Sequence, residues 1–115
     1  MIENYPVTAA MVERGEVWAV EQNGKIVAFY RLDVPNADLD LMFVADEAQG
    51  SGIGRATFEH MKAFAATQGL AEVKIVAHPP AVDFYRRMGA IDVGIQKAWD
   101  ASGWDRPILR VSAGA

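Results

Sequence analysis

The sequence predicts an α/β (α+β) fold, in which one mixed, mostly antiparallel sheet carries helices on both faces. Two observations carry this prediction. Asn23-Gly24 lies between two apolar segments and is a strong signal for a two-residue β-hairpin turn. The glycine-rich residues 49–54 then join the end of an apolar segment to a run with helical spacing, the layout of a strand, a loop and a helix. At 115 residues, the chain is long enough for one core, and we expect a single domain over residues 1–115.

The first half of the chain is expected to form three strands. The hairpin turn predicts strands over 16–22 and 25–33, and a turn at Pro35-Asn36 leads to a third strand over 38–44. That third strand alternates, which predicts one face with the apolar residues at 39, 41 and 43 and the other with Asp38, Asp40, Met42 and Val44. Residues 7–14 are weakly helical.

The second half is expected to form two helices and three strands. Helical spacing of apolar residues predicts a helix over 53–68, with Gly69 at its end. A strand over 72–77 follows, and Pro79-Pro80 begins a short helix that Gly89 ends, since proline is tolerated at the first helical position. Residues 91–97 and 106–112 are expected to form the final pair of strands.

Composition narrows the class of protein. The net charge is −4, and an acidic balance argues against nucleic acid as a partner. The chain has no cysteine, which excludes a disulfide framework and a cysteine nucleophile and suits the cytoplasm. The apolar runs are too short to span a bilayer, and the first ten residues lack the basic region and apolar core of a signal peptide. We therefore expect a cytoplasmic protein without a membrane partner.

The loop from Gln49 to Gly54 has the composition of an anion-binding turn. Glycines allow a concave backbone that aims several N–H groups at one anion, and the helix that follows adds the positive end of its dipole. The Walker loop is absent, and the dinucleotide fingerprint G-x-G-x-x-G would need glycine where Arg55 stands. The alternative is a glycine-rich connection with no ligand.

Two motifs together resemble the GNAT superfamily of N-acetyltransferases. The loop carries Q-x-x-G-x-G at Gln49, Gly52 and Gly54. Farther along, the pattern A-x-x-F-Y-x-x-x-G falls on residues 81–89, and only the Phe that usually follows is replaced, by Ala90. The motifs occur in the family's order, and the resemblance covers roughly residues 16 to 112.

The resemblance implies a sheet whose strands splay apart to admit acetyl-CoA, with no metal. The main chain of Met42, Phe43 and Val44 would pair with the pantetheine arm and the thioester, and a backbone N–H, that of Val44, would stabilise the oxyanion. His78 would hydrogen-bond the pantetheine arm or, alternatively, transfer a proton. The residues expected to hold the pyrophosphate are Gln49, Gly50, Ser51, Gly52, Ile53, Gly54 and Arg55.

The implied reaction is direct attack of a neutral amine on the thioester, with acetyl transfer to a primary amine. Tyr85 occupies the family's usual position for the acid that protonates the leaving thiolate, and a phenol pKa of about 10 lies near that of a thiol. Asp40 is the candidate base, directly or through a water. The alternatives are a core aromatic for Tyr85 and an exposed carboxylate for Asp40.

The sequence departs from the family at its start. The family begins with a strand and two helices that wall the acceptor pocket, whereas about fifteen residues precede the first expected strand here. The acceptor site would then be open to a peptide amine, or a second subunit would complete it in a homodimer. Two other readings compete with the enzyme: a non-catalytic acyl-CoA-binding module that lacks acceptor chemistry, and a plain α/β interaction domain.

Overall fold

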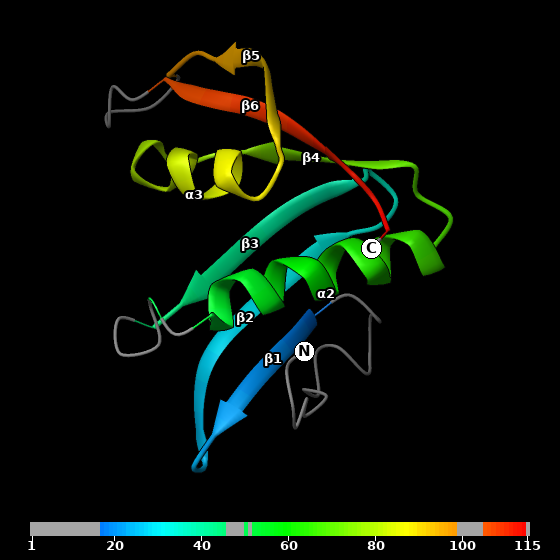
Figure 1. Cartoon of the computed structure of the whole chain (residues 1–115). Helices are drawn as coiled ribbons and strands as arrows, with labels where there is room; N and C mark the ends of the chain where they lie inside the picture. The colour runs from blue at the N-terminus through cyan, green and yellow to red at the C-terminus, as the bar shows by residue number, and fades with distance from the viewer. Residues whose placement is uncertain (1–16, 46–49, 51, 99–104, 115) are drawn as a thin grey trace.

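The computed structural model describes residues 17–45, 50, 52–98 and 105–114, and Figure 1 shows the chain. The order of its elements is the predicted one, and their bounds agree with the expected ranges to within one residue at each end for most of them. The predicted helical segment 7–14 lies outside the described residues. The elements are β1 (Val17–Gln22), β2 (Lys25–Asp33), β3 (Asp38–Val44), α2 (Ile53–Thr67), β4 (Glu72–Val76), the 3-10 helix η2 (Pro79–Ala81), α3 (Val82–Arg87), β5 (Ile91–Gln96) and β6 (Arg106–Ser112).

One six-stranded sheet with the order β1-β2-β3-β4-β6-β5 organises the molecule. All neighbouring strands are antiparallel except β3 and β4, which are parallel. The hairpin between β1 and β2 turns at Asn23 and Gly24, with φ angles of 53° and 77°, as a type I′ turn requires. The predicted mixed, mostly antiparallel sheet is confirmed.

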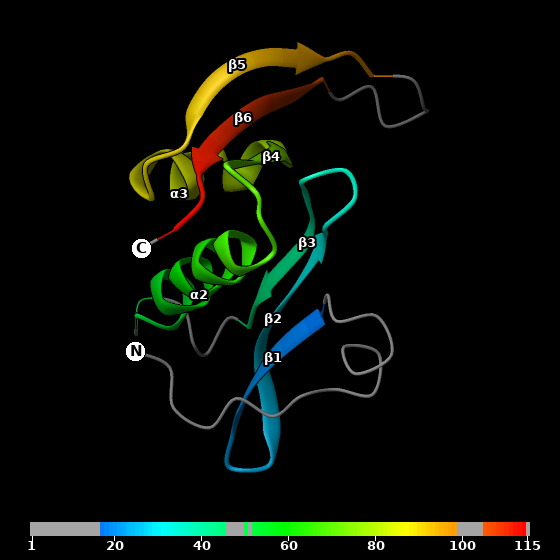
Figure 2. The same cartoon turned by 90° about the vertical axis from the view of Figure 1, so that its right-hand side faces the viewer.

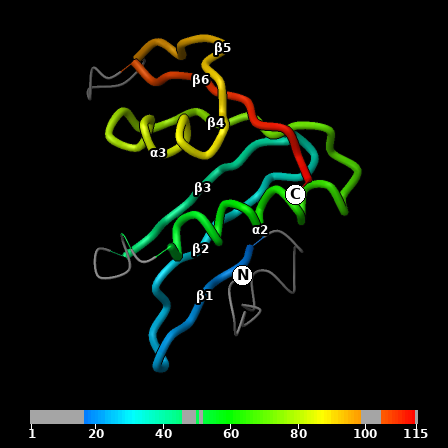
Figure 3. The backbone as a smooth tube through the Cα atoms, viewed as in Figure 1, coloured from blue at the N-terminus to red at the C-terminus, as the bar shows by residue number. Residues whose placement is uncertain are grey.

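The sheet opens between its two parallel strands. Within the described strands, the β3–β4 register has the single pair Asp38 and Lys74, and the Lys74 N–H donates to the Ala37 carbonyl at 2.8 Å. Beyond that pair the strands diverge toward their C-terminal ends, as Figures 1 and 3 show. This divergence is the splay that the sequence resemblance implies.

Both described helices cover the same face of the sheet. Tyr30 of β2 bonds His60 of α2 at 2.8 Å between its hydroxyl and Nδ1. The rings of Phe58 in α2 and Tyr85 in α3 lie 5.9 Å apart, and one buried core joins both helices to the sheet. Figure 2 shows α2 and α3 on one side of the strands. The expectation of helices on both faces is therefore not met in the part of the chain that the structure describes.

A register shift in β3 changes the predicted faces of that strand. Arg31 pairs with Leu41 but the next residue, Leu32, pairs with Leu39, so Asp40 is an extra residue in the ladder. Leu39 is buried and shares the helix-covered face with Met42, because paired residues in an antiparallel ladder point to the same side. The predicted grouping of Asp40 with Met42 and Val44 is wrong, because strict alternation assumes a ladder without a bulge.

Candidate functional site

The glycine loop has the backbone geometry that an anion cradle needs. Gly50 and Gly52 have φ angles of 81° and 90°, in the left-handed region that favours glycine. Gly52 caps α2, which begins at Ile53, and the Ala56 N–H donates to the Gly52 carbonyl at 3.0 Å. The loop thus delivers the chain directly into the N-terminus of α2, where backbone N–H groups point outward. The predicted residues Gln49 and Ser51 lie outside the described residues.

Gly54 is required for a different reason, the close approach of α2 to its neighbours. A Cβ atom at this position would stand 3.2 Å from Cε1 of Phe84 and 3.7 Å from Cγ2 of Val44. The first turn of α2 therefore lies directly against α3 on one side and the end of β3 on the other. This contact fixes the glycine loop relative to the opening of the sheet.

A groove of about 880 Å³ occupies the opening. Its walls are the end of β3, the glycine loop and first turn of α2, and η2 with α3. The groove brings together most of the predicted cofactor residues: Met42, Phe43, Val44, Gly50, Gly52, Gly54, Arg55 and His78, with Tyr85 beside them. Ile53 and Asp40 are not among its lining residues.

The segment formed by η2 and α3 contributes more residues to this groove than the sequence motif indicates. Beside Tyr85, the groove is lined by Pro80, Ala81, Asp83, Phe84, Arg87 and Met88. The spacing of 80/81, 84 and 87/88 is that of one helix face, so a helical wheel of residues 79–89 could have identified them. The A-x-x-F-Y-x-x-x-G motif names only Ala81, Phe84, Tyr85 and Gly89, so it does not identify the other lining residues.

Tyr85 combines a buried ring with a hydroxyl that has no protein partner in the described part of the chain. Its side chain packs against the rings of Phe58 and Phe84, at 5.9 and 5.5 Å, and the residue is 8% exposed. Burial raises the pKa of the Tyr85 phenol above its usual value. The group is therefore protonated at neutral pH and lines the groove, which is the state that an acid needs.

His78 lies at the wall formed by η2 and α3, immediately after β4. It caps η2, and its carbonyl accepts a hydrogen bond from the Ala81 N–H at 2.8 Å. The side chain is exposed and lines the groove. His78 and Tyr85 thus come from the same strand–helix connection and face the same space.

Asp40 lies away from the groove. Its Oδ2 accepts a hydrogen bond from Nη1 of Arg31 at 2.6 Å, and its side chain is half exposed. The bulge places it on the β3 segment near the paired end of the opening rather than beside Val44. The geometric basis for Asp40 as a general base is lost with the corrected register.

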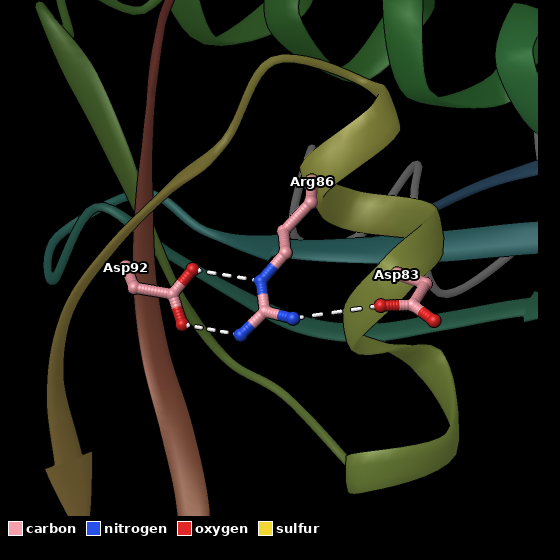
Figure 4. Close-up of polar contacts among 3 residues, drawn as sticks. All are labelled: Asp83, Arg86 and Asp92. Atoms are coloured by element: carbon pink, nitrogen blue, oxygen red, sulfur yellow. Dashed lines mark hydrogen bonds and ion pairs between the residues drawn. The ribbon is translucent and has the colours of Figure 1, made fainter.

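Charged groups gather at the α3 side of the groove, and Figure 4 shows one cluster among them. Arg86 donates from Nε and Nη2 to the two carboxylate oxygens of Asp92, at 2.9 and 2.7 Å, and from Nη1 to Asp83 at 3.5 Å. These hydrogen bonds raise the pKa of Arg86 and lower that of Asp92. Arg55 and Arg87 line the groove, and neither makes an ion pair with any residue that the structure describes.

In the described part of the chain, no group of three or more His, Asp or Glu side chains is arranged to hold a metal ion. Nor is either described helix long and apolar enough to cross a membrane.

Comparisons with known proteins identify a family and related folds for this chain. A family model described as the acetyltransferase (GNAT) domain matches residues 1–99. A search of curated proteins found no match. Among solved structures, nourseothricin acetyltransferase is similar, with 22% identity and a TM-score of 0.74 over 85% of this chain and 65% of that one.

Two further solved structures share the fold. The ribosomal-protein-S18-alanine N-acetyltransferase of Escherichia coli has 22% identity and a TM-score of 0.69, over 100% of this chain and 73% of that one. A Bacillus anthracis protein assigned as a streptothricin acetyltransferase, solved in complex with acetyl coenzyme A, has 13% identity and a TM-score of 0.72, over 85% and 63%. At these identities the similarity is one of fold. The chain spans 65% of the length of nourseothricin acetyltransferase and 63% of the Bacillus protein.

Proposed function

The chain belongs to the GNAT family of acetyltransferases, and from this premise we propose that it transfers an acetyl group from acetyl-CoA to a primary amine. The observation that carries the proposal is the groove between β3 and β4, which both the glycine loop and Tyr85 line. A long ligand with a diphosphate and a reactive thioester matches such a site. The relative solved with acetyl coenzyme A supports this choice of donor.

The residues present fit the two ends of acetyl-CoA. The diphosphate would lie against the N–H groups from Gln49 to Arg55, where positive φ angles at Gly50 and Gly52 support a concave turn. The pantetheine arm would lie along the end of β3, with His78 on the opposite wall. The bound group supplies an activated acyl carbon as its thioester.

Strand geometry supports Val44 as the donor to the oxyanion. The N–H of Ala45 donates to the Val27 carbonyl at 2.8 Å, so it points toward β2. Backbone N–H groups alternate in direction along an antiparallel strand, which turns those of Met42 and Val44 toward the β4 side and that of Phe43 toward β2. A fixed N–H beside the thioester would stabilise the negative charge that develops on its oxygen.

We propose that Tyr85 donates the proton that the leaving thiolate accepts. A neutral amine attacks the acyl carbon, the C–N bond forms, the C–S bond breaks and the phenol protonates the sulfur, while the proton that the nitrogen loses returns to the Tyr85 phenolate. Its raised pKa keeps the phenol protonated until that step. Asp83 is the one carboxylate that lines the groove in the described part of the chain, and its side chain is 81% exposed, so the proposal names Tyr85 alone for proton transfer.

The acceptor is proposed as a primary amine of a small molecule or peptide. The neighbours' names include an antibiotic, nourseothricin, and an alanine of a ribosomal protein, which suggests both kinds for testing. We further propose a cytoplasmic protein, on its lack of cysteine, and a homodimer in which a second copy completes the acceptor side.

A non-catalytic acyl-CoA-binding module is the second candidate. The observation that favours it is the absence of a carboxylate base from the groove lining in the described residues once Asp40 is placed outside it. Such a module would keep the cradle and the splay but would not consume acetyl-CoA.

A thiol-release assay with acetyl-CoA and a panel of amines separates these candidates. The chain has no cysteine, so the protein adds no thiol signal of its own. The panel contains nourseothricin, a diamine, and a short peptide that begins with alanine. We expect amine-dependent release of CoA and a higher melting temperature with acetyl-CoA, since a ligand that binds the folded state stabilises it.

Each contrary outcome has a distinct meaning. Stabilisation by acetyl-CoA without thiol release for any amine would favour the binding module. An unchanged melting temperature at millimolar acetyl-CoA would contradict both candidates.

A further inference from the structure

The proposed donor carries its negative charge in two separate places. CoA has a diphosphate in the middle of the molecule and a phosphate monoester on the 3′ position of its ribose. The glycine loop and the N-terminus of α2 form one cradle, which suits one phosphate cluster. A phosphate monoester carries about −1.5 to −2 charges at neutral pH, so a second cationic group would be needed to recognise it.

Arg87 stands in a position to supply that cation. It is the last residue of α3, it is exposed, and it lines the groove. One helical turn before it, Phe84 lies against Gly54 in the first turn of α2. The close contact therefore brings the end of α3 beside the cradle, with Arg55 on the facing helix.

The neighbouring Arg86 is not equivalent. Its guanidinium is held by both oxygens of Asp92 and by Asp83, as Figure 4 shows. Asp83 lines the groove, where its charge would repel a phosphate, and the ion pair with Arg86 at 3.5 Å offsets that charge. Of the adjacent arginines, Arg86 is engaged within the protein, whereas Arg87 makes no ion pair with the described residues.

We infer that Arg87 binds the 3′-phosphate of CoA and makes the groove select CoA over 3′-dephospho-CoA. The inference rests on the proposed function, because it assigns a selective contact to the same groove. A guanidinium is suited to the role, since its planar fork matches two oxygens of one phosphate.

Calorimetric titration of the full chain with CoA and with 3′-dephospho-CoA tests this assignment. We expect the wild-type protein to bind CoA about tenfold more tightly, the ratio that corresponds to one ordinary charge-assisted hydrogen bond. Arg87→Gln should lose that factor for CoA and keep the wild-type affinity for 3′-dephospho-CoA. Thermal unfolding without ligand checks that the variant is folded.

Arg110→Gln is the matched control. It removes the same charge from an exposed residue of β6 whose partner is Glu72, and Arg110 does not line the groove. We expect this variant to keep the preference for CoA. Loss of the preference for CoA in Arg110→Gln would mean that net charge, not Arg87, sets the preference.

The outcomes separate this inference from the proposed function. Equal affinities of the wild-type protein for the two nucleotides, or an equal loss of both in Arg87→Gln, would overturn the role of Arg87 and leave the proposed function intact. No binding of either nucleotide at millimolar concentration would overturn both.

Discussion

At Tyr85 the ring and the hydroxyl have separable roles. The ring packs in the core against Phe58 and Phe84, while the hydroxyl lies at the groove without a bonding partner among the described residues. A phenylalanine keeps the ring contacts and removes only the hydroxyl that we propose as the acid. The residue therefore allows chemistry to be tested with little effect on packing.

Tyr85→Phe is expected to lower kcat by about 100-fold, the lower end of what a positioned acid contributes. Acetyl-CoA affinity should change little, because the thiolate needs the proton only as it leaves. Steady-state kinetics and a binding titration measure the two quantities. Tyr30→Phe is the control, since it removes the hydrogen bond to His60 in the core and should leave kcat unchanged. Equal kcat values for Tyr85→Phe and the wild-type protein would remove Tyr85 from the mechanism.

Asp40→Asn is expected to keep the wild-type kcat. The carboxylate bonds Arg31 at 2.6 Å, is half exposed, and does not line the groove. An exposed ion pair of this kind contributes about 0–1 kcal/mol, so stability should change by no more than that. Kinetics and urea unfolding provide both measurements. A large loss of kcat with unchanged stability would restore Asp40 as the base.

The positions of groove residues could be predicted directly where a motif names them, whereas residues that share a helix face needed a helical wheel as well. The glycines at 50 and 52 and the tyrosine at 85 follow from short patterns whose chemistry is local. The groove contribution of Arg87 depends on which face of α3 meets α2, and that is set by the contact of Gly54 with Phe84. No local pattern in the sequence encodes that contact.

At the scale of elements, the junction between α2 and α3 depends on Gly54, which has no side chain. Alanine exceeds glycine in helix propensity by up to about 1 kcal/mol, so Gly54→Ala would stabilise an open site. Here the new Cβ would meet Phe84 at 3.2 Å, and we expect crowding of about 1–3 kcal/mol to outweigh that gain. Urea unfolding should show a lower free energy of unfolding, and acetyl-CoA titration should show a lower affinity.

Gly94→Ala is the matched control for this junction. A Cβ there would approach only Ile108, at 3.8 Å, which is ordinary contact. We expect unchanged ligand affinity for this variant. If Gly54→Ala behaved in the same way, the contact of α2 with α3 would not position the cradle.

Element bounds could be predicted because turn residues mark them. Asn23-Gly24 separates β1 from β2, and Gly69 and Gly89, with φ angles of 82° and 98°, end α2 and α3. The bulge at Asp40 could not be predicted in this way. An inserted residue leaves the apolar pattern of β3 readable as plain alternation, and only pairing with β2 reveals that Leu39 replaces Asp40 on the covered face.

At the scale of the whole molecule, the partly buried His60 and the buried Tyr85 set limits on stability against pH. Burial lowers the pKa of His60 below 6.5, so the unfolded chain binds more protons than the folded one when the pH falls through 6.5. Burial raises the pKa of Tyr85 above 10.0, so the unfolded chain loses its proton first as the pH rises through 10.0. These two groups make the free energy of unfolding fall on both sides of that range.

The prediction is a maximum of stability between the two limits, measured by urea unfolding at a series of pH values. His60→Gln should flatten the decrease on the acid side, because glutamine does not titrate, and its amide offers both a donor and an acceptor for the hydrogen bond that His60 makes with Tyr30. Tyr85→Phe should flatten the decrease on the alkaline side. An acid limb unchanged by His60→Gln would assign it to other groups.

The strand order of the sheet could not be predicted from the pattern of apolar residues. β4 pairs with β6 rather than with β5, although β5 comes first along the chain. Pairing between distant segments depends on which faces and edges meet, and apolar alternation alone permits several orders. Of the long-range arrangement, the two motifs predicted only the splay that admits acetyl-CoA.

The middle of the sheet is a seam. Three strands lie on each side of it, and a single register pair crosses it within the described strands, so packing of α2 and α3 is what holds the two half-sheets together. An extended ligand bound in that seam, between β3 and β4, would supply hydrogen bonds like those of an inserted strand. Hydrogen exchange at the amides bordering the seam should then slow in both half-sheets at once on binding, because one ligand would be hydrogen-bonded to both of them.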